Sequence, residues 1–337
     1  MTDHYRPIVR FGEAPGAGAF MVAGGNCWFD SIAVHRRDQP EQTIPAKDAP
    51  ERTLQALTAK RADIAGLVMD RPRLMGILNI TPDSFSDGGQ FNAPDAALAQ
   101  AQRMRAEGAD IIDVGGESTR PGAAEVDARD EIGRTAPVIA AIRAQSNVPI
   151  SIDTRKAPVA QAAIAAGATL VNDVAAFTFD PELGRVTADA KMPVCLMHAQ
   201  GNPQTMQDDP RYDNVLLDVY DFLADRIAAA VAAGIPRNQI IVDPGIGFGK
   251  TVAHNLTLLR GIAIFHSLGC PILLGASRKR FIGVIGGGKA ATDRGSGSVA
   301  VALHAARQGV QFLRVHDIFA TKQALDLEWA IGGVAEI

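Results

Sequence analysis

The sequence predicts an α/β fold, a (β/α)8 TIM barrel preceded by an N-terminal extension. Its 337 residues are enough for one barrel of about 250 residues with additional chain in front of it. From residue 71 to residue 337, short runs rich in Ile, Val and Leu alternate with longer Ala-rich amphipathic stretches, the pattern of βαβ units with a parallel sheet. Eight strand–helix units can be counted, as a closed barrel requires. A doubly wound open sheet is the alternative, because strand number alone does not prove closure.

The extension, residues 1–70, has a different texture. Gly and Pro interrupt it repeatedly, so we expect it to be mostly irregular, with one short strand over residues 28–34 and one helix over residues 50–60. A structural role is the simplest expectation, with Trp28 and Phe29 covering the N-terminal mouth of the barrel. Contact with a partner through this arm is a second interpretation.

The elements of the barrel follow from apolar runs and helix-ending glycines. The predicted strands are residues 74–78, 111–114, 150–153, 169–172, 194–197, 240–243, 272–275 and 312–315. Helical patterns lie between them, for example over residues 96–107, 157–166, 215–233 and 297–307. A glycine stands just before the next strand in four of these connections, at Gly108, Gly167, Gly234 and Gly309, which is typical of a helix C-cap.

Composition excludes several classes of function. With a net charge of −4 the chain lacks the basic footprint of a nucleic-acid-binding protein. Its longest apolar runs, such as residues 162–171, are about half as long as a membrane span, and its first residues are polar rather than signal-like. The three cysteines, Cys27, Cys195 and Cys270, are widely spaced, which favours a reducing compartment. We therefore predict a cytoplasmic globular protein without nucleic-acid or membrane partners.

Polar residues end nearly every predicted strand. In a (β/α)8 barrel the carboxyl ends of the strands converge on one face, so these residues are predicted to form one pocket. For a single position such as Asp113, capping of the next helix is an equally good interpretation. The residues are Asn79, Asp113, Asp153, Asn172, Asp173, His198, Asp243, Ser277, Arg278, Lys279, Arg314 and His316.

The chemistry of this set falls into two groups. Asp153, Asn172 and Asp243 offer acceptors for a heterocycle with amino and ring N–H groups. A second group offers positive charge for phosphate or carboxylate, and Asn79 with Thr119 offers oxygen ligands for Mg²⁺ that also holds phosphate oxygens. The residues of the second group are Arg120, Lys279, Arg314 and His316. The prediction is an enzyme that acts on a phosphorylated, nitrogen-rich aromatic ring.

Two loops and one histidine remain open to two interpretations. Residues 81–89 and 115–122 are long, polar and Gly-rich, and are either mobile lids or surface turns. His198 ends a strand, and either a pocket role or a buried packing role fits it. The glycine-rich residues 245–251 do not form a phosphate-binding P-loop, because Pro244 stands where that motif needs its first glycine.

At these motifs the sequence resembles the dihydropteroate synthase family. The two most specific matches are MGILNITPDSFSDGG at residues 75–89 and DIIDVGGESTRPG at residues 110–122. Shorter matches follow in order at residues 151–154, 172–173, 197–198, 243–250, 277–279 and 314–317. The resemblance extends from about residue 73 to the C-terminus. One departure is the segment after Asp173, where Val174–Phe177 replaces a turn that often contains glycine.

The resemblance implies a function and a set of site residues. The family, a target of sulfonamides, condenses 6-hydroxymethyl-7,8-dihydropterin diphosphate with 4-aminobenzoate in folate biosynthesis, as a Mg²⁺-dependent homodimeric transferase. By position, the pterin would be held by Asp153, Asn172, Met197, Asp243, Phe248 and Lys279, and the diphosphate by Asn79, Thr119, Arg314 and His316, with Asn79 on the metal. The 4-aminobenzoate site would comprise Phe85, Thr119, Arg120, Pro121, Phe248 and Ser277, and the catalytic residues would be Asp87, Lys279, Arg314 and His316.

Two other functions were weighed against this one. A pterin-binding methyltransferase handles no diphosphate. The joint presence of two sets of residues therefore argues against it: Thr119–Pro121, and Lys279 with Arg314 and His316. A catalytically silent pterin-binding barrel is expected to have lost loop or diphosphate residues, and here they are all present.

Overall fold

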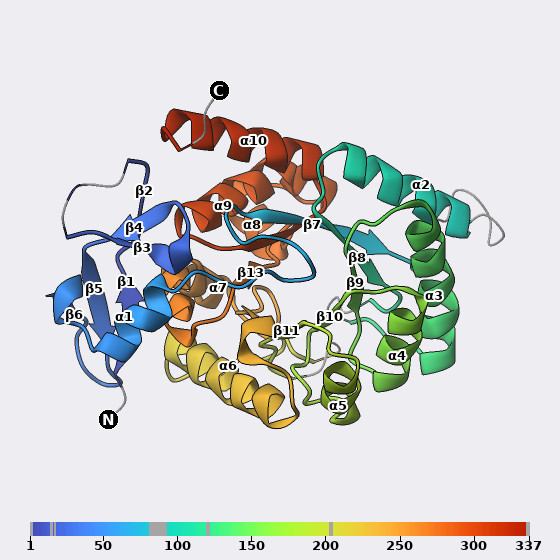
Figure 1. Ribbon diagram of the computed structural model, residues 1–337, viewed down its shortest axis with the longest axis horizontal. Coiled ribbons are helices and arrows are strands. Elements are labelled where there is room, and N and C mark those ends of the chain that lie inside the picture. The colour runs from blue at the N-terminus through green and yellow to red at the C-terminus, as the bar shows by residue number, and fades with distance from the viewer. Residues whose placement is uncertain are drawn as a thin grey trace.

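Eight parallel strands form the sheet at the centre of the molecule, in the order β12-β11-β10-β9-β8-β7-β14-β13 (Figure 1). The computed structural model describes residues 3–13, 16, 18–80, 93–118, 122–201 and 205–334. The first and last strands in that order, β12 and β13, also meet, because Val242 and Ile272 form a parallel bridge and the Val242 amide donates to the Pro271 carbonyl at 3.0 Å. The closed barrel, rather than the open sheet, is therefore confirmed. The strands are β7 (Arg73–Asn79), β8 (Ile111–Gly115), β9 (Ile150–Asp153), β10 (Leu170–Asp173), β11 (Val194–Met197), β12 (Ile240–Asp243), β13 (Leu273–Leu274) and β14 (Phe312–Val315).

Helices surround the barrel and match the predicted stretches closely. The predicted helix over residues 157–166 is observed with the same bounds, and Gly167 ends it in the left-handed conformation, with φ of 110°. The surrounding helices are α2 (Ala93–Ala106), α3 (Ala128–Gln145), α4 (Ala157–Ala166), α5 (Glu182–Asp189), α6 (Val215–Ala232), α7 (Val252–Arg260), α8 (Arg280–Gly286), α9 (Gly295–Arg307) and α10 (Ile318–Ile331), with the 3-10 segment η5 (Ile262–Leu268) after α7.

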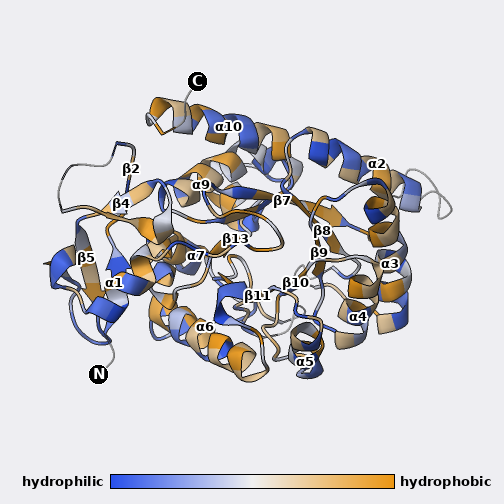
Figure 2. Cartoon of the chain, in the orientation of Figure 1, coloured by the Kyte–Doolittle hydropathy of each residue, from blue (hydrophilic) through white to orange (hydrophobic). Residues whose placement is uncertain are grey.

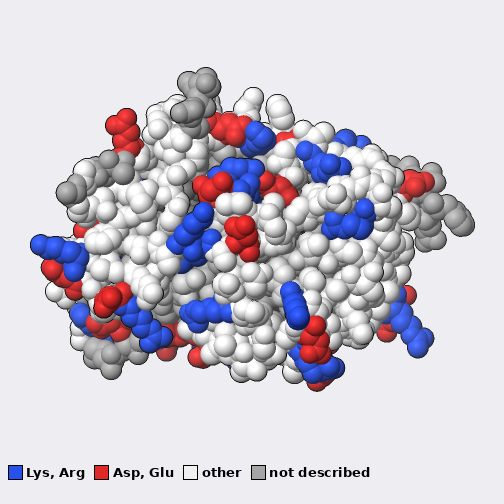
Figure 3. Space-filling view, in the orientation of Figure 1, with Lys and Arg blue, Asp and Glu red and all other residues white. Residues whose placement is uncertain are grey.

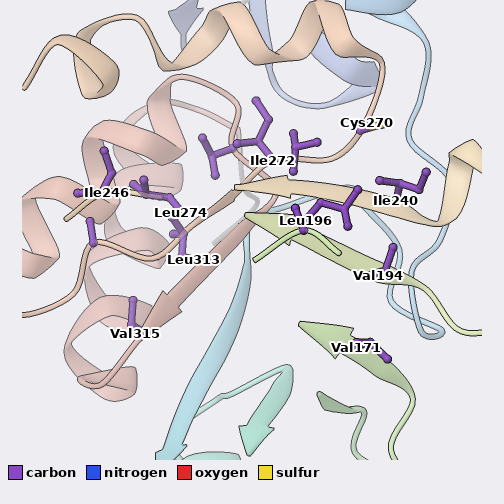
Figure 4. Close-up of a cluster of buried hydrophobic side chains, with 14 of the residues drawn as sticks. Val171, Val194, Leu196, Ile240, Ile246, Cys270, Ile272, Leu274, Leu313 and Val315 are labelled. Carbon is purple, nitrogen blue, oxygen red and sulfur yellow. The ribbon is translucent and has the colours of Figure 1, made fainter. Parts of the chain in front are cut away.

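Successive residues of each strand face opposite sides of the barrel wall. In β11, Val194 and Leu196 join the core between the strands and the helices, whereas Cys195 joins a second cluster at the N-terminal end of the barrel interior. Figure 4 shows the outer set, to which Ile240, Leu274 and Leu313 also belong. Figure 2 shows the same apolar character along β7 and β8. Side chains along a strand alternate between the two faces, so once one residue of a strand faces the barrel interior, every second residue after it does too.

The extension is more regular than the sequence predicts. The single strand predicted for residues 28–34 is broken at Asp30 into two strands that belong to different antiparallel sheets, β2-β4-β3 and β1-β5-β6. The predicted helix is confirmed as α1 (Glu51–Thr58). The strands are β1 (His4–Pro7), β2 (Arg10–Phe11), β3 (Phe20–Met21), β4 (Cys27–Phe29), β5 (Ser31–His35) and β6 (Gln42–Pro45).

The extension covers the N-terminal mouth of the barrel with its last residues and not with Trp28 and Phe29. Phe29 lies in the extension's own core, and the residues that close the N-terminal end of the barrel are Ile64 and Met69, from the segment just before β7. Two polar contacts attach the extension to α6: His4 forms a hydrogen bond with Asp221 at 2.7 Å, and Arg37 forms an ion pair with Asp218 at 2.6 Å. In Figure 1 the extension, in blue, lies at one end of the molecule beside α6.

The surface agrees with the charge composition. On the face drawn in Figure 3, basic and acidic side chains are interspersed rather than gathered by sign. Among the described residues, no helix is long and apolar enough to span a bilayer.

Candidate active site

The inward position at the carboxyl end of most strands is polar. In four strands this polar residue lies two positions after an apolar residue that belongs to the cluster at the opposite, N-terminal end of the barrel. The pairs are Ile111 and Asp113, Leu170 and Asn172, Ile241 and Asp243, and Phe312 and Arg314. Asp153 occupies the equivalent place in β9, paired in register with Asn172 of β10. The period of two therefore seals one end of the barrel with apolar side chains and lines the other with a polar pocket.

Arg314 lies at the centre of this pocket. Its Nε donates to Asp113 Oδ2 at 2.6 Å and its Nη2 donates to Asp153 Oδ2 at 2.7 Å. Burial raises the pKa of Asp153 to about 7, against the opposing charge of Arg314. Burial also disfavours the charged form of Arg314, but the charges of Asp113 and Asp153 outweigh it and hold the guanidinium pKa above its ordinary value. The guanidinium thus joins three strands, β8, β9 and β14.

Asp113 is a pocket residue and not a helix cap. It is fully buried and also accepts a hydrogen bond from Asn172 Nδ2 at 3.3 Å. The N-cap of the following helix, α3, is Asp127, whose side chain accepts from the Arg129 amide. Of the two interpretations that the sequence left open for Asp113, the structure supports the pocket.

Asp173, in contrast, holds the backbone of its own loop. Its carboxylate accepts the amides of Ala175 at 2.8 Å and Phe177 at 2.6 Å. These bonds hold Ala176 and Phe177 at φ of 48° and 65°, in the left-handed region that glycine normally occupies. The turn that departs from the family pattern is therefore built without glycine, by a buried carboxylate.

Asp243 and Met197 are adjacent in the register of β12 and β11. Asp243 Oδ1 accepts the amide of Gly245 at 2.7 Å, and burial raises the pKa of its carboxyl group to about 6, with Lys279, Lys250 and Arg314 among the positive charges that oppose the rise. The second oxygen, Oδ2, lies beside Gly275, where an added Cβ would be 3.5 Å away. Asp243 is thus close to the cations of the same pocket.

Lys279 and Phe248 form one unit at the edge of the pocket. The ammonium group of Lys279 lies 3.9 Å from the centroid of the Phe248 ring. The neighbouring Arg278 points elsewhere, because it pairs with Asp317 through Nε at 3.0 Å. Arg278 has a φ of 58°, so the backbone turns sharply between these two cations.

Ser277 is bound to His316. Its Oγ accepts the backbone amide of His316 at 3.2 Å and lies 3.0 Å from the ring atom Nδ1. When the hydroxyl donates to Nδ1, the proton of the neutral imidazole is on Nε2. The structure therefore gives Ser277 a contact with a residue predicted for the diphosphate, whereas the sequence placed it at the 4-aminobenzoate site.

Asn79 ends β7 at the same face. It is paired in register with Gly115, which is paired in turn with Asp153. A Cβ on Gly115 would lie 3.6 Å from Asn79 Oδ1 and 3.7 Å from Asp153 Oδ2, so both oxygens border the same small space. Within the described ranges no three His, Cys, Asp or Glu side chains could hold a metal among themselves. Oxygen donors of this kind fit Mg²⁺ that a ligand's phosphate oxygens complete.

His198 is buried and its ring contacts protein on several sides. Its Nδ1 lies 2.9 Å from Lys250 Nζ, and its ring meets Phe222 edge-on at 4.8 Å between centroids. Burial lowers the pKa of the imidazole to about 2, so His198 stays neutral. These contacts support the packing interpretation. Lys250, which the sequence analysis did not select, is its buried partner.

A second buried ion cluster, also missed, lies below the loop after β8. Glu117 accepts from Arg155 at 3.1 Å and from Lys156 at 3.1 Å, and Lys156 also pairs with Glu131 at 2.7 Å. The position of Glu117 inside the motif at residues 110–122 was the available signal. Five predicted site residues lie outside the described ranges, so their placement stays a prediction: Phe85, Asp87, Thr119, Arg120 and Pro121.

Comparison with known proteins supplies the context for this pocket. The family model described as pterin binding enzyme matches residues 75–316. The dihydropteroate synthase of Escherichia coli K12 is 46% identical over 255 residues, which are 75% of this chain and 89% of that protein. The enzyme of a Synechocystis species is 47% identical over 250 residues, covering 74% of this chain and 86% of the relative.

Solved structures of dihydropteroate synthases are also similar to this chain. The Xanthomonas albilineans dihydropteroate synthase with 4-aminobenzoic acid superposes with a TM-score of 0.77 at 47% identity, covering 82% of this chain and 99% of that one. The same enzyme in complex with 7,8-dihydropteroate gives 0.74 at 44% identity, covering 82% and 100%. A Yersinia pestis dihydropteroate synthase with a sulfonamide drug complex gives 0.76 at 45% identity, covering 81% and 99%. The family model begins at Met75, within β7, so it does not include the residues that precede β7.

Proposed function

This chain belongs to the dihydropteroate synthase family of pterin-binding enzymes, and we propose how its own residues carry out the reaction of that family. It is a transferase that condenses 6-hydroxymethyl-7,8-dihydropterin diphosphate with 4-aminobenzoate to give 7,8-dihydropteroate and diphosphate. The observation that carries the assignment of roles is the buried bridge of Arg314 to Asp113 and Asp153. It places a cation for the leaving group next to acceptors for the ring.

The pterin ring is assigned to Asp153, Asn172 and Asp243. Their oxygens face inward at the carboxyl ends of β9, β10 and β12, where they can accept the amino and ring N–H groups of a pterin. The ionised carboxylate is the acceptor, so the raised pKa values of Asp153 and Asp243 make ring binding sensitive to pH near neutrality. Phe248, Lys279 and Met197 complete this part of the pocket. Phe248 offers a flat apolar surface on which an aromatic ring can pack.

The diphosphate is assigned to the side of the pocket formed by Arg314, His316 and Asn79. Arg314 binds its two carboxylates through Nε and Nη2, which leaves Nη1 for a phosphate oxygen. His316 is a second donor in the tautomer in which Ser277 donates to Nδ1 and the ring proton is on Nε2. Asn79 Oδ1 would hold Mg²⁺, which supplies positive charge to the departing diphosphate when bound.

The chemical step is a substitution at the methylene carbon of the pterin. The bond from that carbon to the diphosphate oxygen breaks with its electron pair leaving on oxygen, and the nitrogen of 4-aminobenzoate forms the new bond and releases a proton. Because negative charge grows on the leaving group, the groups that accelerate the step are donors and cations around it rather than a strong base. Arg314, His316 and Lys279 meet this need. Asp87 keeps its predicted catalytic role, and Phe85 and Thr119–Pro121 keep their predicted roles at the 4-aminobenzoate site.

The test is diphosphate release by the purified chain, with each substrate and Mg²⁺ omitted in turn and dihydropteroate identified by mass. We expect product only when both substrates and the metal are present, and none after removal of divalent cations by a chelator until Mg²⁺ is restored. Folded protein that binds the pterin but forms no product would instead support a silent binding barrel. Full activity in metal-free solution would remove Asn79 and Mg²⁺ from the assignment.

We also propose a homodimer in the cytoplasm, with α9 and α10 at the interface. An open groove runs between these helices, and two large apolar side chains that line it are exposed, Phe319 and Leu327. Exposed apolar residues grouped in this way mark protein interfaces. Light scattering should give the mass of two chains for the wild type and of one chain for a Phe319→Ser, Leu327→Glu double variant. Cell fractionation tests the location.

A further inference from the structure

The loops that follow β11 and β12 are joined by a buried lysine. Lys250 is 3% exposed, and its ammonium nitrogen lies 2.9 Å from the Phe248 carbonyl oxygen, 3.4 Å from the His198 carbonyl oxygen and 2.9 Å from His198 Nδ1. An ammonium group has three N–H donors, and these three acceptors satisfy all of them. The two acceptors of His198 belong to the loop after β11. The third acceptor is the carbonyl oxygen of Phe248, whose ring contacts Lys279.

Glycines allow the two loops to approach this closely. A Cβ on Gly245 would lie 1.9 Å from the His198 carbonyl oxygen, and one on Gly249 would lie 2.5 Å from the Gln200 carbonyl oxygen. Both glycines have positive φ, of 67° and 61°. Phe248 therefore sits on a loop pressed against its neighbour, and Lys250 is the side chain that fixes the carbonyl of Phe248 to that neighbour.

We propose that Lys250 is a positioning residue for the pterin site, which acts by fixing Phe248 where its ring holds the Lys279 ammonium group. The inference rests on the proposed assignment of Phe248 and Lys279 to the pterin. Lys250 need not touch the substrate: its donors are used by His198 and by the Phe248 backbone, and the Phe248 ring lies 3.9 Å from Lys279 Nζ. The order of contact is thus from Lys250 to Phe248, and from Phe248 to Lys279.

The proposal differs from a general role in holding the loop together. Other side chains also bind carbonyl groups of this loop: Tyr212 donates to Gly249 at 2.7 Å and Gln207 donates to Gly247 at 2.6 Å. Neither of these bonds is to Phe248. If Lys250 matters only for loop stability, loss of the Tyr212 hydroxyl should have a similar effect. If Lys250 matters for Phe248, the two substitutions should differ.

A double-mutant cycle between Lys250 and Phe248 tests the proposal. The variants are Lys250→Met, Phe248→Ala and the pair, with kcat/KM for the pterin diphosphate as the readout and circular dichroism to confirm folding. Small displacements of a positioned group cost about 10- to 100-fold in rate, so we expect a loss in that range for K250M alone. In the F248A background the same substitution should cost less than about threefold, because the group through which it acts is absent.

Tyr212→Phe is the matched control and should stay within about twofold of the wild type. Equal losses from K250M in both backgrounds, or a loss in Y212F as large as in K250M, would overturn the positioning role. Unchanged activity in F248A alone would instead overturn the assignment of Phe248 to the pterin, so the two failures are distinguishable. If K250M does not fold, Lys250→Gln retains an amide donor and should show a smaller loss with the same non-additivity.

Discussion

Replacing Arg314 by methionine should leave two buried carboxylates without their shared counter-charge. Asp113 is fully buried and Asp153 is 6% exposed, and among the described residues Arg314 is the cation that pairs with both of them. Neither carboxylate can therefore be solvated in place of the lost guanidinium. Breaking a buried ion pair by removing one partner typically costs about 3–5 kcal/mol of unfolding free energy. The carboxylates can reduce this cost by retaining a proton. Arg314→Met should therefore destabilise the protein strongly at high pH and less at low pH.

The pH dependence can be worked out from linkage. Burial already raises the folded-state pKa of Asp153 to about 7, and loss of the Arg314 charge raises it further above its unfolded value. The folded variant therefore retains a proton that the unfolded chain has released, and its stability falls as pH rises. Each pH unit over which the variant retains one more proton than the wild type adds about 1.4 kcal/mol to its deficit. Because the pKa of Asp153 is about 7 in the wild type, that carboxyl group already retains about half a proton on average between pH 6 and pH 8, and we expect the deficit to grow by about 1–1.5 kcal/mol over this window.

Urea unfolding at pH 6, 7 and 8 measures this deficit directly. Arg307→Met is the matched control, because Arg307 pairs with Glu328 at 2.6 Å on the surface and is 54% exposed. An exposed pair contributes about 1 kcal/mol or less, and its loss should be nearly independent of pH in this range. A deficit for Arg314→Met that is the same at all three pH values would refute the electrostatic explanation and leave only a loss of packing.

Three further predictions follow from other contacts. Because burial raises the pKa of Asp153 to about 7 and of Asp243 to about 6, kcat/KM for the pterin diphosphate should fall as pH drops from 8 to 5.5; a flat profile would contradict the acceptor roles. Ser277→Ala removes two hydrogen bonds to His316 and should lower turnover by about tenfold, whereas Ser277→Thr, which keeps the hydroxyl, should recover most of it. Arg37→Ala breaks the pairs with Asp218 and Asp221 and should lower stability by about 1 kcal/mol or less in thermal unfolding, with unchanged activity.

The sequence was sufficient for the barrel because its signals are local and repeated. Each strand is a short apolar run in which every second side chain faces the barrel interior, and the inward residue at its carboxyl end faces the pocket. Asp153, Asn172, Asp243 and Arg314 could therefore be assigned to one face before any contact was known. In the extension, strands such as Arg10–Phe11 are too short to show an alternation. They form because distant segments pair, which no local pattern reports.

The parts of the site that the sequence did not predict are those defined by distant partners. Lys250 is an ordinary lysine in a glycine-rich loop until the fold brings it to His198, 52 positions earlier in the chain. Asp113 had two interpretations because a strand-end aspartate can cap a helix or line a pocket, and only the contact with Arg314, 201 positions later, separates them. Residue type and position along a strand predict which face a side chain occupies, but not which charge it meets there.

The balance of charge in the pocket gives a physical reason for the proposed metal. Within the part of the chain that the structure describes, three carboxylates, on Asp113, Asp153 and Asp243, are accompanied by three basic side chains, Arg314, Lys250 and Lys279. Each of the three already has partners in the protein: Arg314 binds two carboxylates, Lys250 binds His198 and Phe248, and Lys279 lies over the Phe248 ring. A diphosphate adds several negative charges to a site that is close to neutral, and burying uncompensated charge is costly. The substrate therefore needs additional positive charge on entering, and a divalent cation that binds both Asn79 and the diphosphate oxygens would supply it.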